Sequence, residues 1–215
     1  MIIMPISEKT LELNICSEIS RWLKKRIIWT GLTQKQEAKA GWDACTRING
    51  RFFILQFKSS KKVKKTPTDP RRFYAKHEQM LNLIKKVKSN RSVFYVFPDL
   101  STRQELLNCS DILDQTYVYD VKAIPRNIPF PLKKDGAPRK SGLHYIDIFT
   151  NIPIPKIIIH SEPIVANLTK IKEISIEGEY IEKIIKFDDE INFETFWQLC
   201  KTLGRKLIGG IITNE

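Results

Sequence analysis

An acid, an amide and an ammonium group flank one short turn in this sequence. Asp43 precedes the dipeptide Asn49-Gly50, and Gln56 and Lys58 follow it. A carboxylate and an amide carbonyl are hard oxygen ligands of the kind that Mg²⁺ prefers, and an ammonium group can stabilise a phosphate. These residue types predict a metal-and-phosphate site, provided that the fold brings them together. The alternative is a half-exposed hairpin with a polar rim and no chemistry.

The turn itself predicts the register that would bring them together. Asn-Gly between two apolar-rich runs is the strongest short-range signal for a β-hairpin with a two-residue loop. Ile48 then faces Arg51, and Asp43 faces Gln56. Opposed residues of an antiparallel pair share a face, and side chains alternate along each strand. Asp43, Gln56 and Lys58 are therefore expected on one side of the hairpin, at its open end.

Helices and a buried strand are predicted around the hairpin. An amphipathic helix is expected over about residues 7–25, with Ser7 as its cap, and a second helix over about residues 74–88. Residues 92–98 are continuously apolar, which is typical of a strand buried on both faces. Because a crossover helix permits a parallel strand beside the hairpin, this order predicts an α/β core with a mixed β-sheet flanked by helices.

Shorter elements complete the predicted organisation. They are strands at residues 27–29, 116–121, 144–149 and 156–160, a short helix at 101–109, and a terminal helix from about residue 192. Four prolines between residues 124 and 142 predict a long loop or flap. We expect a core at 1–121, a Pro- and Lys-rich loop at 122–143, and an α+β extension at 144–215 packed on the core.

Basic residues are concentrated directly after the hairpin. The chain carries 36 Lys and Arg against 24 Asp and Glu, a formal net charge of +12. Between residues 58 and 91, twelve basic minus two acidic residues leave +10. Such a block attracts a polyanion by counterion release, which predicts a nucleic acid partner; the alternative is a solvated, lysine-rich loop. The residues of this block expected to contact phosphates are Lys61, Lys62, Lys64, Lys65, Arg71 and Arg72.

Composition argues against several classes of protein. Hydrophobic residues make up 42% and aromatic residues 10%, which excludes a wholly disordered chain. The four cysteines have no metal-ligand spacing, so neither a structural zinc site nor a disulfide framework is indicated. The start, MIIMPIS, has no basic region typical of a signal peptide, and no stretch approaches the ~20 apolar residues of a membrane helix. We therefore expect a cytoplasmic protein with no membrane partner.

The hairpin residues resemble a known family. Asp43, followed across a hairpin by Gln56-Phe57-Lys58 and preceded by a helix containing glutamates, is similar to the PD-(D/E)xK nuclease superfamily over about residues 7–100. The resemblance implies a restriction-endonuclease-like core of αβββαβ order and hydrolysis of phosphodiester bonds with Mg²⁺ or Mn²⁺. DNA is the expected substrate, and RNA stays open. Asp43, Gln56 and the main-chain carbonyl of Phe57 are the expected metal ligands.

One departure from the family concerns the second acid. Gln56 stands where the family usually has a carboxylate, a substitution found in some active branches but also compatible with lost activity. Trp42 rather than proline precedes Asp43, which is common in the superfamily. A neutral glutamine leaves one negative charge fewer for the cation, so the affinity for Mg²⁺ should be weak unless another carboxylate helps.

The family often takes that further carboxylate from the first helix. Glu18 and Glu12 are the candidates, with Glu8 a distant third. At 100° per residue Glu18 and Glu12 lie on opposite flanks of the apolar stripe, so only one of them can readily face the hairpin. Glu18 is preferred, as a metal ligand, because its distance along the chain suits a short connection to Asp43. The alternative is that both are ordinary flanking glutamates.

In this superfamily the second helix commonly flanks the active site. The resemblance therefore implies that side chains at its start reach phosphate, namely Tyr74, His77 and Gln79. An isolated histidine in a lysine-rich helix is also compatible with a plain surface residue.

Two main hypotheses follow. The first is a metal-dependent nuclease centred on Asp43, Gln56 and Lys58, and a homodimer is compatible with it. The second is a catalytically inactive nucleic-acid-binding module on the same scaffold, in which Gln56 marks the decay of the metal site. A third is a scaffold protein whose basic loop meets an acidic partner. Lys58 in register with Asp43 favours the first, because a binding module needs no acid facing the phosphate.

Overall fold

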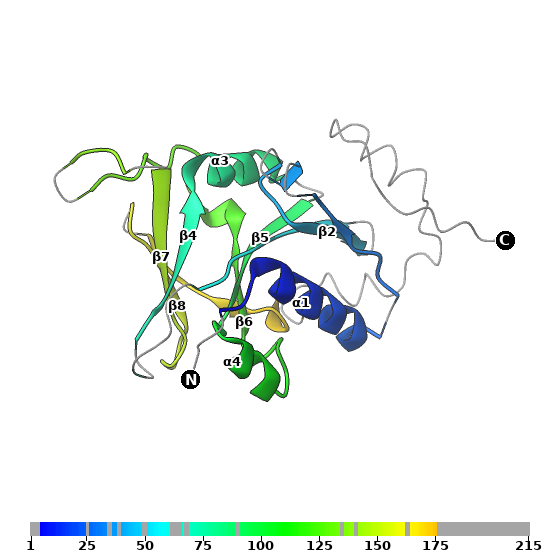
Figure 1. The fold of residues 1–215 in the computed structure, drawn as a ribbon. Coiled ribbons are helices and arrows are strands. Elements are labelled where there is room, and N and C mark those ends of the chain that lie inside the picture. The colour runs from blue at the N-terminus through cyan, green and yellow to red at the C-terminus, as the bar shows by residue number, and fades with distance from the viewer. Residues whose placement is uncertain are drawn as a thin grey trace.

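Two β-sheets and three α-helices make up the described part of the chain, which is mixed α/β (Figure 1). The structure is a computed structural model. It describes residues 5–24, 26–33, 36–37, 40–48, 51–60, 66, 69–88, 91–133, 136–139, 142–161 and 164–175.

The larger sheet has six strands and is mixed. Its order is β1 (Thr30–Gly31), β2 (Ala44–Ile48), β3 (Arg51–Phe57), β5 (Arg91–Pro98), β6 (Thr116–Asp120) and β10 (Thr169–Lys170). Strands β2 and β3 pair antiparallel, and β3 pairs parallel with β5. The predicted mixed sheet, with a hairpin beside a parallel strand, is therefore confirmed. Strand β5 is buried along nearly its whole length, as its apolar run predicts.

The second sheet has four antiparallel strands. Its order is β4 (Arg71–Lys76), β7 (Leu143–Phe149), β8 (Lys156–Ile159) and β9 (Ile164–Asn167). Two short 3₁₀ helices, η1 (Val121–Ala123) and η3 (Glu173–Ser175), lie in connecting segments.

One face of the six-stranded sheet is covered by α1 (Glu8–Trp22). The side chain of Ser7 accepts a hydrogen bond from the Thr10 N–H and caps this helix, as its position predicts. Leu11, Ile15 and Ile19 form its apolar stripe and pack on the sheet together with residues of β3 and β5. The carboxyl-proximal end of β3 therefore lies next to α1.

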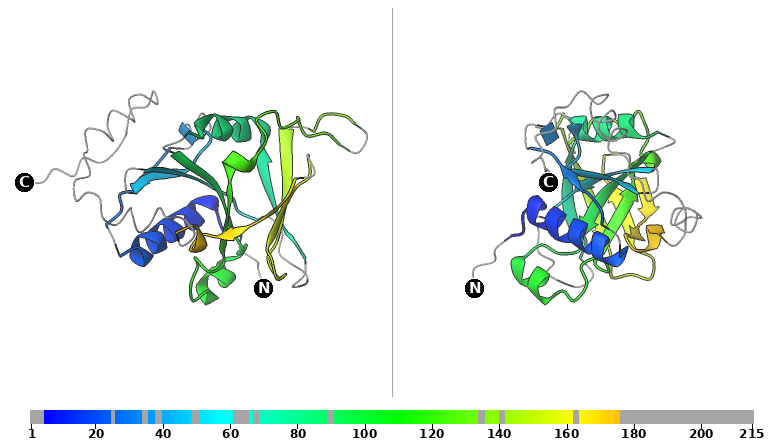
Figure 2. Two further views of the ribbon diagram at one scale, coloured as in Figure 1. Left: turned by 180° about the vertical axis from the view of Figure 1, so that it is seen from behind. Right: turned by 90° about the vertical axis from the view of Figure 1, so that its right-hand side faces the viewer.

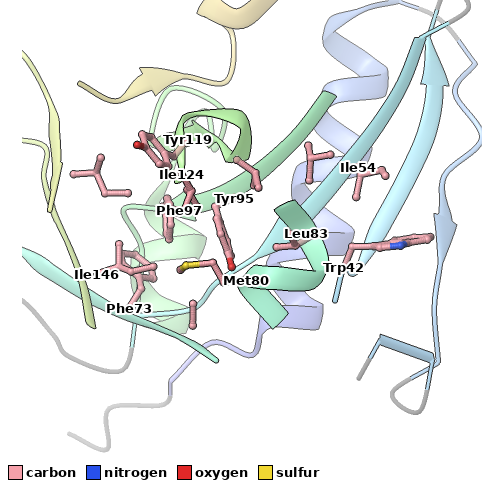
Figure 3. Close-up of a cluster of buried hydrophobic side chains, with 14 of the residues drawn as sticks. Trp42, Ile54, Phe73, Met80, Leu83, Tyr95, Phe97, Tyr119, Ile124 and Ile146 are labelled. Atoms are coloured by element: carbon pink, nitrogen blue, oxygen red, sulfur yellow. The ribbon is translucent and has the colours of Figure 1, made fainter. Parts of the chain in front are cut away.

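The opposite face of this sheet packs on α3 (His77–Lys86) and on the second sheet (Figure 2). Met80 and Leu83 of α3 contact the same cluster as Phe97 of β5, and Phe73 and Ile146 bring in the second sheet (Figure 3). Phe73 and Phe97 meet edge to face with centroids 5.0 Å apart. This cluster forms the larger of two apolar cores.

The prediction for residues 74–76 was wrong. The second helix begins at His77, and the preceding residues form β4. Phe73 and Ala75 are buried between exposed or half-buried neighbours, which is the alternation of a strand. The partner of β4 is β7, about seventy residues further along, with Tyr74 opposite Tyr145. A pairing this distant leaves no local signal, and the helical spacing after His77 dominated the sequence pattern.

Other predicted elements agree with the structure within a few residues. The predicted strands at 116–121, 144–149 and 156–160 correspond to β6, β7 and β8, and the helix at 101–109 to α4 (Arg103–Asn108). Residues 27–29 are irregular, and the short strand is Thr30–Gly31 instead, where backbone pairing with β2 is made. The predicted terminal helix from residue 192 lies outside the described residues.

In each sheet, a strand that precedes residue 121, the predicted end of the core, pairs with a strand that follows it. β10 pairs with β6, and β7 pairs with β4. The described segments of 122–143 are largely irregular after η1, as their prolines predict. Within the described ranges, no helix combines the length and apolar character that crossing a membrane requires.

Candidate metal and phosphate site

The hairpin register brings Asp43 beside Gln56. Ile48 lies opposite Arg51, and the ladder continues to Ala44 opposite Leu55. Asp43 lies one residue before β2, and its N–H donates to the carbonyl of Leu55 at 3.1 Å.

Gly41 and α3 hold the start of this strand in place. Gly41 has φ +78°, a left-handed conformation that strains other residues. A Cβ at this position would also lie 3.1 Å from the carbonyl oxygen of Gln79. Glycine therefore permits the close passage of the chain against α3 directly before Asp43.

The Asp43 carboxylate is buried and doubly hydrogen-bonded. Its Oδ2 accepts from Gln56 Nε2 at 2.6 Å and from the Phe57 N–H at 2.7 Å. Gln56 Nε2 also donates to the main-chain oxygen of Phe57 at 3.0 Å. The three groups expected as metal ligands therefore meet at one point of the fold.

Gln56 is fully buried, and its two polar atoms differ in their surroundings. The amide nitrogen lies between Asp43 Oδ2 and the Phe57 oxygen, whereas Oε1 has no hydrogen-bond partner within the described part of the chain. An acceptor left unsatisfied in the interior costs about 1–3 kcal/mol. This cost opposes the two hydrogen bonds that the amide nitrogen makes.

Lys58 completes the group from the end of β3. It is buried, and its N–H donates to Val96 O at 3.0 Å, which anchors it to β5. Its Nζ lies 3.9 Å from Glu8 Oε1. Glu8 also accepts from the Ser59 N–H at 3.3 Å. The start of α1 therefore supplies a carboxylate next to the lysine.

The surroundings of Asp43 stabilise its protonated form relative to that of an exposed aspartate. Burial raises the pKa of Asp43 to about 7; the positive charge of Lys58 lowers it, and the negative charge of Glu8 raises it. Burial disfavours the carboxylate because the interior solvates charge poorly. A buried carboxylate of this kind gains strongly from a cation that neutralises it.

The position of Glu18 corrects the preferred choice among the helix glutamates. Glu18 Oε2 pairs with Arg21 at 2.5 Å, and ten helical residues, about 15 Å of rise, separate it from Glu8. Glu8, the least favoured candidate, is the one that contacts Lys58. The apolar stripe could not reveal which end of the helix packs over the open end of the hairpin.

Glu12 is buried and forms an ion pair with Lys9. Both of its carboxylate oxygens accept from Lys9 Nζ, at 2.8 and 2.9 Å. Lys9 Nζ also lies 3.9 Å from Glu37. Neither Lys9 nor Glu37 was predicted from the sequence as a site residue. The i,i+3 spacing of Lys9 and Glu12 on a helix could have indicated their ion pair, whereas no local spacing indicates that Glu37 lies near Lys9.

All four lysines predicted to contact phosphates, Lys61, Lys62, Lys64 and Lys65, lie outside the described residues.

Arg71 and Arg72, both expected to contact phosphates, are each paired with acidic side chains. Arg71 is buried, where it bonds Asp99, Ser101 and Glu105. Arg72 makes a two-bond pair with Asp147, at 2.7 and 2.6 Å. Strand alternation in β4 turns Arg71 into the core, which no local pattern indicated.

The remaining three residues lie along β4 and α3. Tyr74 packs edge-on against Tyr145, with centroids 5.2 Å apart, and Gln79 is half-buried on α3. His77 Nδ1 shares a hydrogen bond of 3.0 Å with His144 Nε2, and the two rings stack. None of the three is hydrogen-bonded to Asp43, Gln56 or Lys58 in the described structure.

His144, which belongs to no predicted site, is fully buried between His77 and Ser161. Burial lowers its pKa to about 4, and the charges of His77 and Arg139 lower it too. The unfolded chain therefore binds more protons than the folded protein between pH 4 and 6.5. Stability should fall as the pH decreases through this range, by at most about 3 kcal/mol from this residue.

This acid sensitivity can be measured by urea unfolding at pH 7 and pH 4.5. His144→Gln, which cannot charge, should lose about 2 kcal/mol less than the wild type between the two pH values. The two proteins differ at residue 144 alone, so the difference reports His144 together with its coupling to His77. An equal loss in both proteins would contradict a neutral buried histidine.

A cation at Asp43 would have few charged ligands. Across the described ranges, no three His, Cys, Asp or Glu side chains are grouped as metal ligands. The set at the hairpin consists instead of one carboxylate, one amide and one main-chain carbonyl. These are oxygen donors that suit Mg²⁺ or Mn²⁺, with a smaller negative charge than two carboxylates would provide.

Comparison with known proteins adds no assignment. No family model matches this chain, and no curated protein matches it either. The geometry at the hairpin is therefore the basis for any functional conclusion.

Proposed function

We propose that this protein is a metal-dependent nuclease that hydrolyses phosphodiester bonds in nucleic acid, with DNA as the expected substrate. The observation that carries the proposal is the buried amide of Gln56. Its NH₂ group bonds the two oxygens, Asp43 Oδ2 and Phe57 O, that would bind a cation, while its own oxygen stays unsatisfied. A cation bound here would meet the same two oxygens.

The donor set fits Mg²⁺ or Mn²⁺. Asp43, the carbonyl of Phe57 and, after rotation of its amide, Oε1 of Gln56 would hold the ion. In that orientation Oε1 would bind the ion, and its unsatisfied state in the present orientation would be relieved. When bound, such an ion polarises the scissile phosphate and lowers the pKa of an attacking water.

The element order also supports the proposal. With β4 of the second sheet left aside, helix α1, strands β1 to β3, α3 and β5 come in the order of the αβββαβ core expected for a PD-(D/E)xK nuclease. Strand β3, which carries Gln56 and Phe57, is central to the six-stranded sheet and parallel to β5. The second sheet departs from this order because β4 precedes α3.

The protein's own side chains would act on the phosphate as follows. The main chain of Lys58 is bonded to β5, and its buried side chain is close enough to Asp43 to lower the pKa of that carboxyl. There it would stabilise the negative charge that develops on the phosphoryl oxygens. Glu8, 3.9 Å from Lys58 Nζ, would orient that ammonium and accept hydrogen bonds from water.

The direct test is cleavage by the purified protein. Plasmid, linear duplex, single-stranded DNA and RNA are incubated with Mg²⁺ or Mn²⁺ and, in parallel, with EDTA. We expect nicking or cleavage of at least one substrate with the divalent ion and none with EDTA. Intact substrates under all conditions would remove the support for catalysis.

Restoring the family's second acid should strengthen metal binding. Gln56→Glu adds a negative charge beside Asp43, so we expect the affinity for Mg²⁺ to rise by at least about tenfold. Isothermal titration calorimetry measures the change directly. Gln56→Leu, which removes the amide without adding a charge, is the matched control and should bind the ion more weakly than the wild type.

The alternative function is a nucleic-acid-binding module without catalysis. The neutral Gln56 and the lack of three charged or imidazole ligands among the described residues favour it. It predicts salt-sensitive binding that needs no divalent ion and survives Asp43→Ala. The cleavage assay separates the two functions.

A further inference from the structure

The second sheet has an outer face that differs from its inner face. Along β4 and β7, Phe73, Ala75 and Ile146 point into the core, so the residues between them point the other way. In Figure 1 the described helices all lie on the core side of this sheet. The outward residues of β4, β7 and β8 include Arg72, Tyr74, Lys76, Tyr145, Asp147, Lys156 and Ile158. We call this surface the Tyr74/Tyr145 face.

Aromatic rings and guanidinium groups pack against one another on this face. Tyr74 and Tyr145 are directly opposite in the ladder and meet edge to face. The guanidinium carbon of Arg139, from the preceding loop, lies 3.9 Å from the centroid of the Tyr145 ring, and that of Arg72 lies 5.5 Å from it. Nε of Arg139 donates to the Leu132 carbonyl at 2.9 Å, which fixes the orientation of the guanidinium plane.

The face is also basic. Its three cations named above (Arg72, Lys76 and Lys156) minus one anion (Asp147) leave +2, and the adjoining Arg139 brings the total to +3. Asp147 is buried beneath Arg72 and His160, at 2.6 and 2.8 Å. Burial disfavours its charge, but the hydrogen bonds from Arg72 and His160 prevail and lower the pKa of Asp147. The acid therefore positions Arg72 and presents no exposed repulsion to an anion.

We infer that the Tyr74/Tyr145 face binds single-stranded nucleic acid, an inference that rests on the proposed function. Flat aromatic and guanidinium groups on a sheet stack on unpaired bases, and cations around them contact the phosphates. A duplex conceals its base faces and would use only the charges. An acidic protein partner would bind through the cations alone and would leave the aromatic rings without a role.

The face is joined to the candidate site by a short connection. Ser60, two residues after Lys58, donates from its hydroxyl to the carbonyl of Arg72 at 3.3 Å. Strand β4 is the edge of the second sheet, so Arg72 lies at the side of the face nearest to this connection. A single-stranded nucleic acid bound to the face would thus be kept close to Lys58. Binding would raise the local concentration of the nucleic acid at the candidate site.

The test measures fluorescence anisotropy of labelled oligothymidylate and of a labelled duplex, in EDTA so that no cleavage occurs. Tyr145→Leu and Arg139→Gln should each weaken single-strand binding about tenfold, and duplex binding less. Tyr145→Phe keeps the ring and should bind like the wild type, which separates stacking from loss of fold. Arg126→Gln is the matched control, because Arg126 is an exposed cation of the same loop; it should change affinity by less than about threefold.

The outcomes also separate this inference from the proposed function. Equal effects of Arg139→Gln and Arg126→Gln, or unchanged binding by Tyr145→Leu, would overturn the face as a stacking site, even if the wild type cleaves. If the wild type cleaves nothing but binds single strands, and Tyr145→Leu weakens that binding, the face is supported as a binding site and the proposed nuclease activity is overturned. Absence of single-strand binding by the wild type at low salt would also overturn the face.

Discussion

Asp43→Asn is expected to abolish divalent-dependent cleavage, with a loss of roughly three orders of magnitude in rate, while stabilising the metal-free protein. The loss follows from removal of the only charged ligand in the proposed set. The gain follows from burial, because the asparagine oxygen can still accept from Gln56 and from the Phe57 N–H without the cost of a buried charge.

The titration of Asp43 determines the pH range in which Asp43→Asn raises the free energy of unfolding. Because the pKa of Asp43 is raised to about 7 from 3.8, the folded wild type binds more protons than the unfolded chain between these values. Its stability therefore falls as the pH rises through this range. In EDTA at pH 8, Asp43→Asn should gain up to about 4 kcal/mol in free energy of unfolding, and near pH 4 almost nothing.

Urea unfolding with and without Mg²⁺, together with the cleavage assay, checks both parts. The control is Asp111→Asn, which removes a carboxylate that pairs with Lys172 far along the chain. It should leave cleavage unchanged. Full activity of Asp43→Asn would exclude Asp43 as a metal ligand.

Lys58→Met should reduce cleavage by about 10²-fold to 10³-fold while the protein still binds the divalent ion. Methionine keeps most of the length and apolar volume of the buried stem but has no charge. The affinity for Mg²⁺ should stay equal or rise, because a cation is removed next to the site. Loss of rate with retained metal binding would assign Lys58 to the phosphate.

Calorimetric metal titration and single-turnover cleavage measure the two effects separately. Lys122→Met, which removes an exposed cation outside both sheets, is the matched control and should cleave like the wild type. If Lys58→Met lost metal binding and cleavage equally, the role of the lysine would be to hold the site together.

Local sequence patterns were sufficient for the elements whose signals are short in range. The dipeptide Asn49-Gly50 predicted the pairing of Ile48 with Arg51 that is found between β2 and β3. Ser7 predicted the start of α1, and the apolar run at 92–98 predicted β5. In each case the physical cause lies within a few residues, as turn geometry, capping or burial on both faces.

Local patterns also misassigned β4. Its alternation of buried and outward residues is short and merges into the helix that begins at His77. The strand exists because β7 supplies the hydrogen bonds and because Phe73 meets Phe97. As a result, Arg71 is buried, and the Tyr74/Tyr145 face could not be foreseen.

By itself, the sequence determined that an acid, an amide and a lysine flank a hairpin, and that a basic segment follows. Only the tertiary structure decided that Glu8 rather than Glu18 lies beside Lys58, and that the Gln56 amide lies between Asp43 and the Phe57 carbonyl. Helical periodicity defines the buried side of α1 but not which end packs over the hairpin. That choice depends on long-range packing against β3 and β5, which no local pattern encodes.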